Sequence, residues 1–183
     1  GLSVSKLTGL VSSAPPLSQV QVIHGDNGRM DDRVFPAGAF DINGQQVDMR
    51  ERNSWTLKLG EVEPGEAAET LVINALVPFM VNSALLPLME QSAVEPKFIV
   101  NVSAMEGCFY RRRKTPCHPH TNMAKAALNM MTRTCAEDLA KKHIYMNSVD
   151  TGWINNELPS RLAAQQSMNT PLDEIDGAAR ILD

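Results

Sequence analysis

Apolar side chains recur at helical spacing over a long stretch between residues 66 and 90. The turn signal in residues 63–66 precedes this stretch and delivers the chain into a helix. Pro78 and Pro87 fall inside it, so we expect a kink or an early end there. A second long helix is predicted over residues 121–141. The positions that define the first helix are Leu71, Ala75, Val77, Met80, Val81, Leu85, Leu86 and Leu88.

Two short β-branched runs predict strands. Residues 97–102 are apolar on both faces, which is typical of a buried parallel strand, and residues 144–149 form a second run. Weaker helices are predicted over residues 160–166 and 173–182. The order helix, strand, helix, strand, helix predicts an α/β fold with a parallel sheet.

The first third of the chain has little periodicity. Residues 11–50 are rich in turn-forming pairs of proline, glycine, asparagine and aspartate, and residues 20–23 alone indicate a short strand. We therefore expect an irregular arm or loop over residues 1–62 and a folded α/β region over residues 63–183. A loop of this length indicates an insertion, a lid or an arm that packs on a partner.

Composition and charge exclude several classes of protein. The chain has 21 acidic and 17 basic residues, a net charge of −4, which argues against nucleic-acid binding. The apolar run over residues 76–89 is interrupted by Asn82 and Ser83, and its length predicts no membrane insertion. Three cysteines and a start that does not resemble a secretory leader indicate a reducing compartment. These features predict a soluble intracellular protein, in the cytoplasm or in an organelle.

Four segments in chain order carry a set of motifs. Residues 73–79 read INALVPF, residues 101–107 read NVSAMEG, residues 121–128 read TNMAKAAL, and residues 147–154 read NSVDTGWI. Together they resemble the short-chain dehydrogenase/reductase family. Its fifth strand and following loop have the form N-[IV]-S-S-x-x-G, its signature is Y-x-x-x-K, and its sixth strand leads into N-x-[IV]-x-P-G-x-[IV].

The resemblance implies roles for individual residues. Lys125 matches the lysine that holds the cofactor ribose and lowers the pKa of the catalytic tyrosine, and Asn74 matches the asparagine of the proton relay. Gly152 and Ile154 fall in the segment that contacts the cofactor. The implied chemistry is hydride transfer between NAD or NADP and a carbonyl or alcohol carbon.

The chain departs from the family pattern at the residues that move the proton. Ala104 stands in place of the active-site serine and Thr121 in place of the tyrosine. A threonine hydroxyl is a weaker acid than a phenol, and losing a positioned general acid costs about 10²–10⁴ in rate. His120 and Tyr110 are candidate substitutes, with His118 two residues before His120.

The segment from Cys117 to His120 also has simpler interpretations. It is expected to be a loop that leads into a helix, with exposed histidines. A zinc site formed by Cys108, Cys117, His118 and His120 has a ligand spacing that matches no standard pattern. The basic run over residues 111–114 indicates a solvated loop, with phosphate binding as the alternative.

The family's glycine-rich loop, T-G-x-x-x-G-x-G, is absent from the sequence. The expected fold is therefore an incomplete Rossmann-like, doubly wound parallel sheet without the N-terminal dinucleotide-binding half. A strand with an unpaired edge has three explanations: a longer chain, a partner that completes the sheet in a homo-oligomer or a larger complex, or a fold remodelled around residues 1–62. The first two are favoured. Two functions stay open: an impaired or atypical NAD(P)-dependent oxidoreductase, and a non-catalytic structural or interaction subunit.

Overall fold

The computed structural model describes residues 31–112, 114–166 and 170–183. The strand predicted at residues 20–23 lies outside these residues. Within them, residues 31–62 form turns with two isolated bridges, Phe40 to Gln46 and Lys58 to Cys117. The regular elements follow in chain order: α2 (Pro64–Leu71), the π-helical turn η1 (Val72–Leu76), α3 (Val77–Gln91), β1 (Lys97–Ser103), the 3₁₀ turn η2 (Met105–Gly107), α4 (Pro119–Ala140), β2 (Ile144–Asp150), α5 (Ser160–Ala163) and α6 (Glu174–Leu182).

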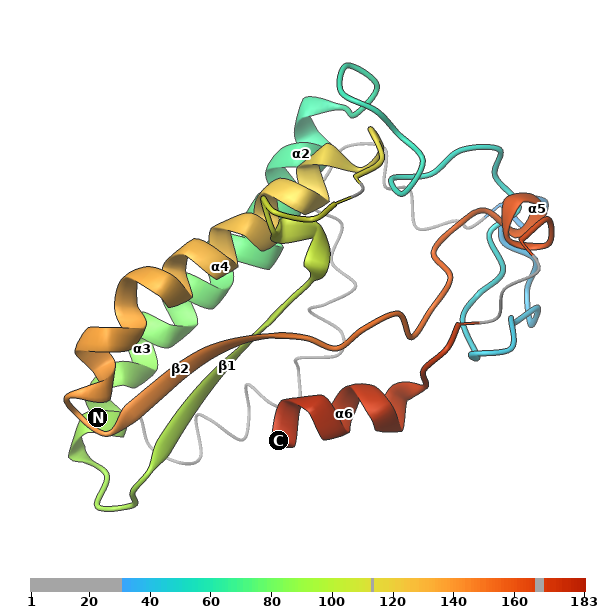
Figure 1. The fold of residues 1–183 in the computed structure, drawn as a ribbon. Coiled ribbons are helices and arrows are strands. Elements are labelled where there is room, and N and C mark those ends of the chain that lie inside the picture. The colour runs from blue at the N-terminus through green and yellow to red at the C-terminus, as the bar shows by residue number, and fades with distance from the viewer. Residues whose placement is uncertain (1–30, 113, 167–169) are drawn as a thin grey trace. The chain divides into compact units, whose positions relative to one another are not determined.

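The predicted order of helices and strands is confirmed. Strands β1 and β2 pair in parallel, with Lys97 opposite Ile144 and Ser103 opposite Asp150. Helix α4 connects them and packs on both strands (Figure 1), and α2 and η1 pack against α4. The predicted helix over residues 160–166 is shorter than expected and ends at Ala163. Asp173 caps the N-terminus of α6, and its carboxylate accepts from the backbone N–H groups of Ile175 and Asp176.

The first long helix continues past both prolines, so the expected early end is wrong. Instead a π-helical turn precedes Pro78, where the Val77 N–H donates to the Val72 carbonyl. Proline has no N–H to donate, and its ring clashes with a carbonyl four residues earlier in a regular α-helix. The wider turn accommodates this clash, and α3 continues through Pro87 to Gln91.

Taken together, α2, η1 and α3 form a 28-residue apolar helix, Pro64–Gln91, which by length and composition could cross a membrane. This helix is longer than the apolar run that the sequence analysis placed at residues 76–89. These two criteria alone do not show membrane insertion, because helices of soluble proteins also meet them. In this chain α2 and η1 pack against α4, and α3 packs against β1.

A small apolar core lies between the sheet and the helices. It contains Ile99, Leu139, Ile144 and Met146, with Leu86, Met89, Cys135 and Ala136 packed against it. Asn101 is buried within this layer. Its amide donates to Thr132 Oγ1 at 3.0 Å, and its oxygen accepts from the Asn82 amide at 3.3 Å. The asparagine of the NVSAMEG segment therefore joins α3, β1 and α4.

The prediction that the first strand is buried on both faces is wrong for the described part of the chain. Residues alternate along β1, and the face that carries Phe98 and Val102 is exposed. Tyr145 on β2 lies beside Phe98 on this face, with ring centroids 5.9 Å apart. Helices α3 and α4 pack on the other face. Strand β1 therefore carries apolar side chains on a face that no element of the described residues covers.

Candidate active site

A cleft of about 710 Å³ opens at the carboxyl ends of the two parallel strands. Ligands of open parallel sheets bind at this edge, because the loops that follow the strands converge there. The loop after β1, the segment after β2, the N-terminal turn of α4 and the turn at Trp55 all contribute to its wall. The lining residues include Trp55, Thr56, Ser103, Ala104, Met105, Glu106, Arg111, Lys114, Cys117, His118, Asn122, Asp150, Thr151, Gly152, Trp153, Ile154 and Glu157.

The loop after β1 brings an alanine to the cleft where a serine was expected from the family pattern. Ala104 has no side-chain donor, and the hydroxyl of the buried Ser103 donates to the Lys125 carbonyl at 3.2 Å. Gly107 ends this loop against α4. A Cβ at Gly107 would lie 2.6 Å from the Lys125 carbonyl carbon, so glycine permits the close approach of the two backbones.

Lys125 lies on α4, and its side chain reaches the carboxyl end of β1. Its Nζ donates to the Val102 carbonyl at 3.0 Å, and burial lowers the pKa of its ammonium group. Neither Lys125 nor Thr121, one turn before it, lines the cleft. Asn74 lies in the π-helical turn η1, which packs against α4, and its side-chain amide donates to the Thr70 carbonyl at 3.1 Å.

The segment after β2 turns at Gly152, which has a φ of +86°. A Cβ there would meet the side chains of Arg180 and Leu172. The Gly152 N–H donates to the Asp150 carboxylate at 3.0 Å, which closes the turn. Ile154 contacts Gly177 of α6, and both Gly152 and Ile154 line the cleft. Helix α6 therefore supports the segment expected to contact a cofactor.

His118 is the residue just before α4, and it is one of the residues that line the cleft. Its backbone is left-handed, with φ of 43° and ψ of 49°, and its N–H donates to the Leu57 carbonyl at 2.7 Å. Its ring stacks on Trp55, with centroids 4.2 Å apart and planes 7° from parallel. Nδ1 of His118 and Oδ1 of Asn122 are both buried from solvent.

Electrostatics favour the neutral form of His118. Burial lowers the pKa of its imidazole, and a side-chain hydrogen bond with Asn122 opposes that shift, while the electrostatic effects of His120 and Lys114 lower the pKa further. The expectation of exposed histidines is wrong, since His118 and His120 retain 8% and 3% of their exposure. Both are buried because residues 54–58 and α2 pack against this part of α4.

The two substitutes expected from the sequence lie elsewhere. His120 does not line the cleft, and its Nε2 lies 3.5 Å from Glu66 Oε1, which also accepts from the Ser54 hydroxyl. Tyr110 is fully exposed and does not line the cleft. Their placement favours neither as a group that meets a substrate there.

The proposed zinc ligands do not come together. Among the residues that the structure describes, no group of three or more histidine, cysteine, aspartate or glutamate side chains could hold a metal ion. In the basic run, Arg111 pairs with the Glu106 carboxylate, and Lys114 donates to the Glu106 carbonyl. Arg111, Arg112 and Lys114 are exposed, as a solvated loop predicts.

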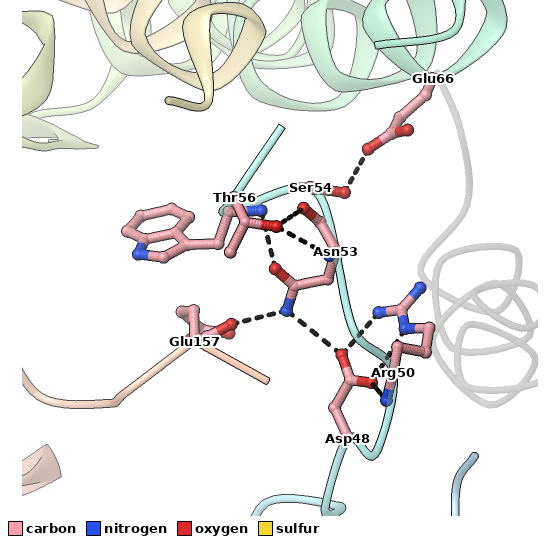
Figure 2. A network of polar contacts seen from close by, with 8 residues as sticks. Asp48, Arg50, Asn53, Ser54, Thr56, Glu66 and Glu157 are labelled. Carbon is pink, nitrogen blue, oxygen red and sulfur yellow. Dashed lines mark hydrogen bonds and ion pairs between the residues drawn. The ribbon is translucent and has the colours of Figure 1, made fainter. Parts of the chain in front are cut away.

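A polar network that sequence analysis missed fixes the turn at Trp55 (Figure 2). The Asn53 amide donates to the Glu157 carbonyl at 2.7 Å and to Asp48 Oδ2 at 3.2 Å. Asn53 Oδ1 accepts from the Trp55 N–H at 3.1 Å, and Arg50 pairs with Asp48 at 2.7 Å. The sequence signal was the NSWT segment, because asparagine side chains commonly close turns on a backbone two residues ahead.

Comparison with known proteins identifies the family. The family model described as enoyl-(acyl carrier protein) reductase matches residues 50–176. Three curated relatives are similar in sequence. An uncharacterized protein of Acanthamoeba polyphaga mimivirus is 31% identical over 76% of this chain and 31% of its own length. The C-signal protein of Myxococcus xanthus is 31% identical over 65% of this chain and 72% of its own length. The short chain dehydrogenase pgmD of Aspergillus terreus is 27% identical over 70% and 38%.

A solved structure shares the fold. Carbonyl reductase Sniffer of D. melanogaster superposes with a TM-score of 0.56 at 23% identity, over 69% of this chain and 52% of that chain. The chain thus spans about half the length of this structure and about a third of the mimivirus protein. The matched region contains the cleft and all four motif segments. The chain belongs to the short-chain dehydrogenase/reductase family.

Proposed function

We propose that the protein is an NAD(P)-dependent oxidoreductase that acts on carbonyl or alcohol groups, with an atypical proton relay. The observation that carries this proposal is the cleft, where the loop after β1, the N-terminus of α4 and the segment after β2 meet. Three of the four segments that resemble the family's motifs contribute to its wall. The relatives named short chain dehydrogenase and carbonyl reductase support the same class of reaction.

The residues present fit the nicotinamide end of a dinucleotide. Ala104, Thr151, Gly152 and Ile154 form an uncharged part of the cleft wall, which suits a carboxamide-bearing ring, while charged residues line the rest of the cleft. When bound, a nicotinamide supplies or accepts a hydride at the substrate carbon. The sequence has no glycine-rich loop for the pyrophosphate. We infer that the phosphates are held by a further part of the protein or by a partner.

We assign Lys125 and Asn74 to the roles that the family pattern implies. The Lys125 ammonium can donate to ribose hydroxyls, because lysine carries three donors and its bond to the Val102 carbonyl uses one. Asn74 lies in a π-helical turn, a feature that is frequent at functional sites, and this turn packs against the helix that carries Lys125. Gly152 and Ile154 complete the surface for the cofactor.

A specific observation favours a second candidate, a non-catalytic interaction subunit of a homo-oligomer or larger complex. Ala104 and Thr121 replace the serine and the tyrosine of the family pattern. Among the three curated relatives described above, this chain covers the largest share of the C-signal protein. The exposed apolar face of the sheet, at Phe98 and Val102, would suit a partner. Under this hypothesis the cleft binds no nicotinamide.

Nucleotide binding decides between the two. Native mass spectrometry first shows which chains the full-length protein from its source contains. NADH and NADPH are then titrated into that protein. We expect one of the two to bind, and Lys125→Met to weaken that binding by 10-fold or more, on the order of one lost charge-assisted contact. Lys141→Met is the matched control, because Lys141 is exposed at the far end of α4. Failure of both nucleotides to bind would refute the oxidoreductase and favour the interaction subunit.

A further inference from the structure

Two segments far apart in the chain meet at the wall of the cleft. One is the arm segment that carries Trp55, and the other is residues 151–158, which follow β2. Residues 151–157 lie in no helix, strand or turn, so no regular backbone bonding holds them in place. Trp55, Glu157 and Leu158 also line a second cavity of about 450 Å³. These residues therefore form a thin wall between two open spaces, and hydrogen bonds rather than packing must fix its position.

The end of residues 151–158 that is nearest to β2 is fixed without the arm. The Gly152 N–H donates to the Asp150 carboxylate at 3.0 Å. Gly177 of α6 lies so close to Ile154 that a Cβ at Gly177 would clash with that side chain. This end contains residues that we assigned to the nicotinamide, and its supports are β2 and α6.

The other end of the segment is bonded to the arm through Asn53 (Figure 2). Asn53 Nδ2 donates to the Glu157 carbonyl at 2.7 Å and to Asp48 Oδ2 at 3.2 Å, and Asn53 Oδ1 accepts from the Trp55 N–H at 3.1 Å. The amide nitrogen faces two acceptors and the oxygen faces a donor, so a flipped amide would lose all three bonds. The Ser160 N–H donates to the Asp48 carbonyl at 2.7 Å, which ties the arm to the start of α5.

Neighbouring groups of the arm hold Asn53 in one orientation. The Arg50 guanidinium donates to both oxygens of Asp48, at 2.9 and 2.7 Å, and the Asp48 side chain retains only 15% of its exposure. The Asn53 N–H donates to Thr56 Oγ1 at 3.1 Å. Asn53 cannot release the Glu157 carbonyl by rotating, because rotation would leave its amide and a half-buried carboxylate without partners.

We propose that Asn53 is a positioning residue of the cleft. It holds the Glu157 end of the wall and the Trp55 turn at the spacing that the carbonyl or alcohol substrate requires, since binding groups must be placed to within about 0.5 Å. This inference rests on the proposed oxidoreductase function. The nicotinamide surface at Gly152 and Ile154 has its own supports. Asn53 therefore acts on the binding of the substrate and leaves the binding of the nucleotide unchanged.

The test compares Asn53→Asp with Asn43→Asp in the full-length protein. An ionised aspartate still accepts from the Trp55 N–H but donates nothing to the Glu157 carbonyl. Asn43 is a matched control, because it is exposed in a turn of the same arm and undergoes the same change of charge. The probe is 4-nitrobenzaldehyde with NADPH or NADH. We expect Asn53→Asp to raise KM for the aldehyde about 10-fold, with kcat and the nucleotide Kd within about 3-fold of the wild type and of Asn43→Asp.

Acidification separates positioning from a general loss of structure. The titratable and charged groups around this link are Asp41, Asp48, Arg50, Glu66, His118 and Glu157. Asn53→Ala retains all of these groups, so comparing it with Asn53→Asp at each pH cancels their titration. Protonation of the introduced carboxyl restores a donor to the Glu157 carbonyl. As the pH falls from about 8 to about 5, we expect the KM of Asn53→Asp to approach that of the wild type, while the KM of Asn53→Ala stays raised.

A second measurement needs no turnover. The aldehyde is titrated into the complex with oxidised nucleotide, which holds no hydride to transfer, and ¹⁹F NMR of 5-fluorotryptophan at Trp55 reports its Kd. We expect Asn53→Asp to raise this Kd about 10-fold and Asn43→Asp to leave it unchanged.

The outcomes distinguish the two proposals. An unchanged KM and Kd for the aldehyde in Asn53→Asp, or an equal loss of nucleotide affinity, would overturn the role of Asn53 while nucleotide binding by the wild type still supported the oxidoreductase. An aldehyde that neither reacts with nor binds the nucleotide complex of the wild type would overturn the assignment of this wall to the substrate. If neither nucleotide binds the wild type, both proposals fail together.

Discussion

The contact between Gly107 and α4 gives a sharp prediction about stability. A Cβ at Gly107 would lie 2.6 Å from the Lys125 carbonyl carbon, 2.8 Å from the Ala126 nitrogen and 2.9 Å from the Lys125 oxygen. Ordinary van der Waals contact begins near 3.4 Å, so Gly107→Ala must separate the loop from the helix by about 0.5–0.8 Å. All three obstructing atoms are backbone atoms of a 22-residue helix and cannot rotate away.

The expected cost of Gly107→Ala follows from this geometry. Overpacking a well-packed site costs about 1–3 kcal/mol when side chains can adjust. Because a helix backbone must move here, we expect the upper end, about 3 kcal/mol of the free energy of unfolding. For a domain of this size that loss lowers Tm by roughly 6–12 °C.

Urea unfolding followed by circular dichroism measures this change. Gly60→Asn is the control, because Gly60 has a φ of +87° and open space around its Cβ position. Asparagine tolerates such a backbone, so the control should lose no more than about 1 kcal/mol. A loss below about 1 kcal/mol for Gly107→Ala, equal to the control, would show that the loop moves freely from α4 and would refute the reasoning.

Two further predictions concern the wall of the cleft. Burial lowers the pKa of His118 in the folded state, so the unfolded state binds more protons as the pH falls through the ordinary histidine pKa of about 6.5. The protein therefore loses free energy of unfolding at this site as the pH falls below that value. Urea unfolding at pH 7.5 and at pH 5.5 should show a smaller loss between the two for His118→Asn than for the wild type. Equal losses in the two proteins would contradict the lowered pKa of His118. Asn53→Ala removes bonds to Asp48, Glu157 and the Trp55 N–H, and should cost about 1–3 kcal/mol of unfolding free energy with a change in Trp55 fluorescence. An unchanged emission spectrum would show that Trp55 is held by other contacts.

The fold could be predicted over the elements whose signals are local. The β-branched run before Ser103 predicted β1, and the long helix predicted over residues 121–141 is α4. The π-helical turn before Pro78 could not be predicted, since a kink, an early end and a widened turn all relieve the same clash. The uncovered face at Phe98 was also missed, because an apolar residue does not specify which partner covers it.

Some features of the candidate site could likewise be predicted from the sequence, and others depend on tertiary contacts. The sequence by itself determined the family motifs, the positions of Lys125 and Asn74 in their helices, and the loss of the serine and tyrosine at Ala104 and Thr121. Covalent order is enough for these, because each motif is a contiguous segment. Only the tertiary structure decided that His118, and not His120, is one of the residues that line the cleft. Two residues on the same turn differ in their surroundings because Trp55 packs on one and Glu66 pairs with the other, and both contacts join segments more than 50 residues apart in the chain.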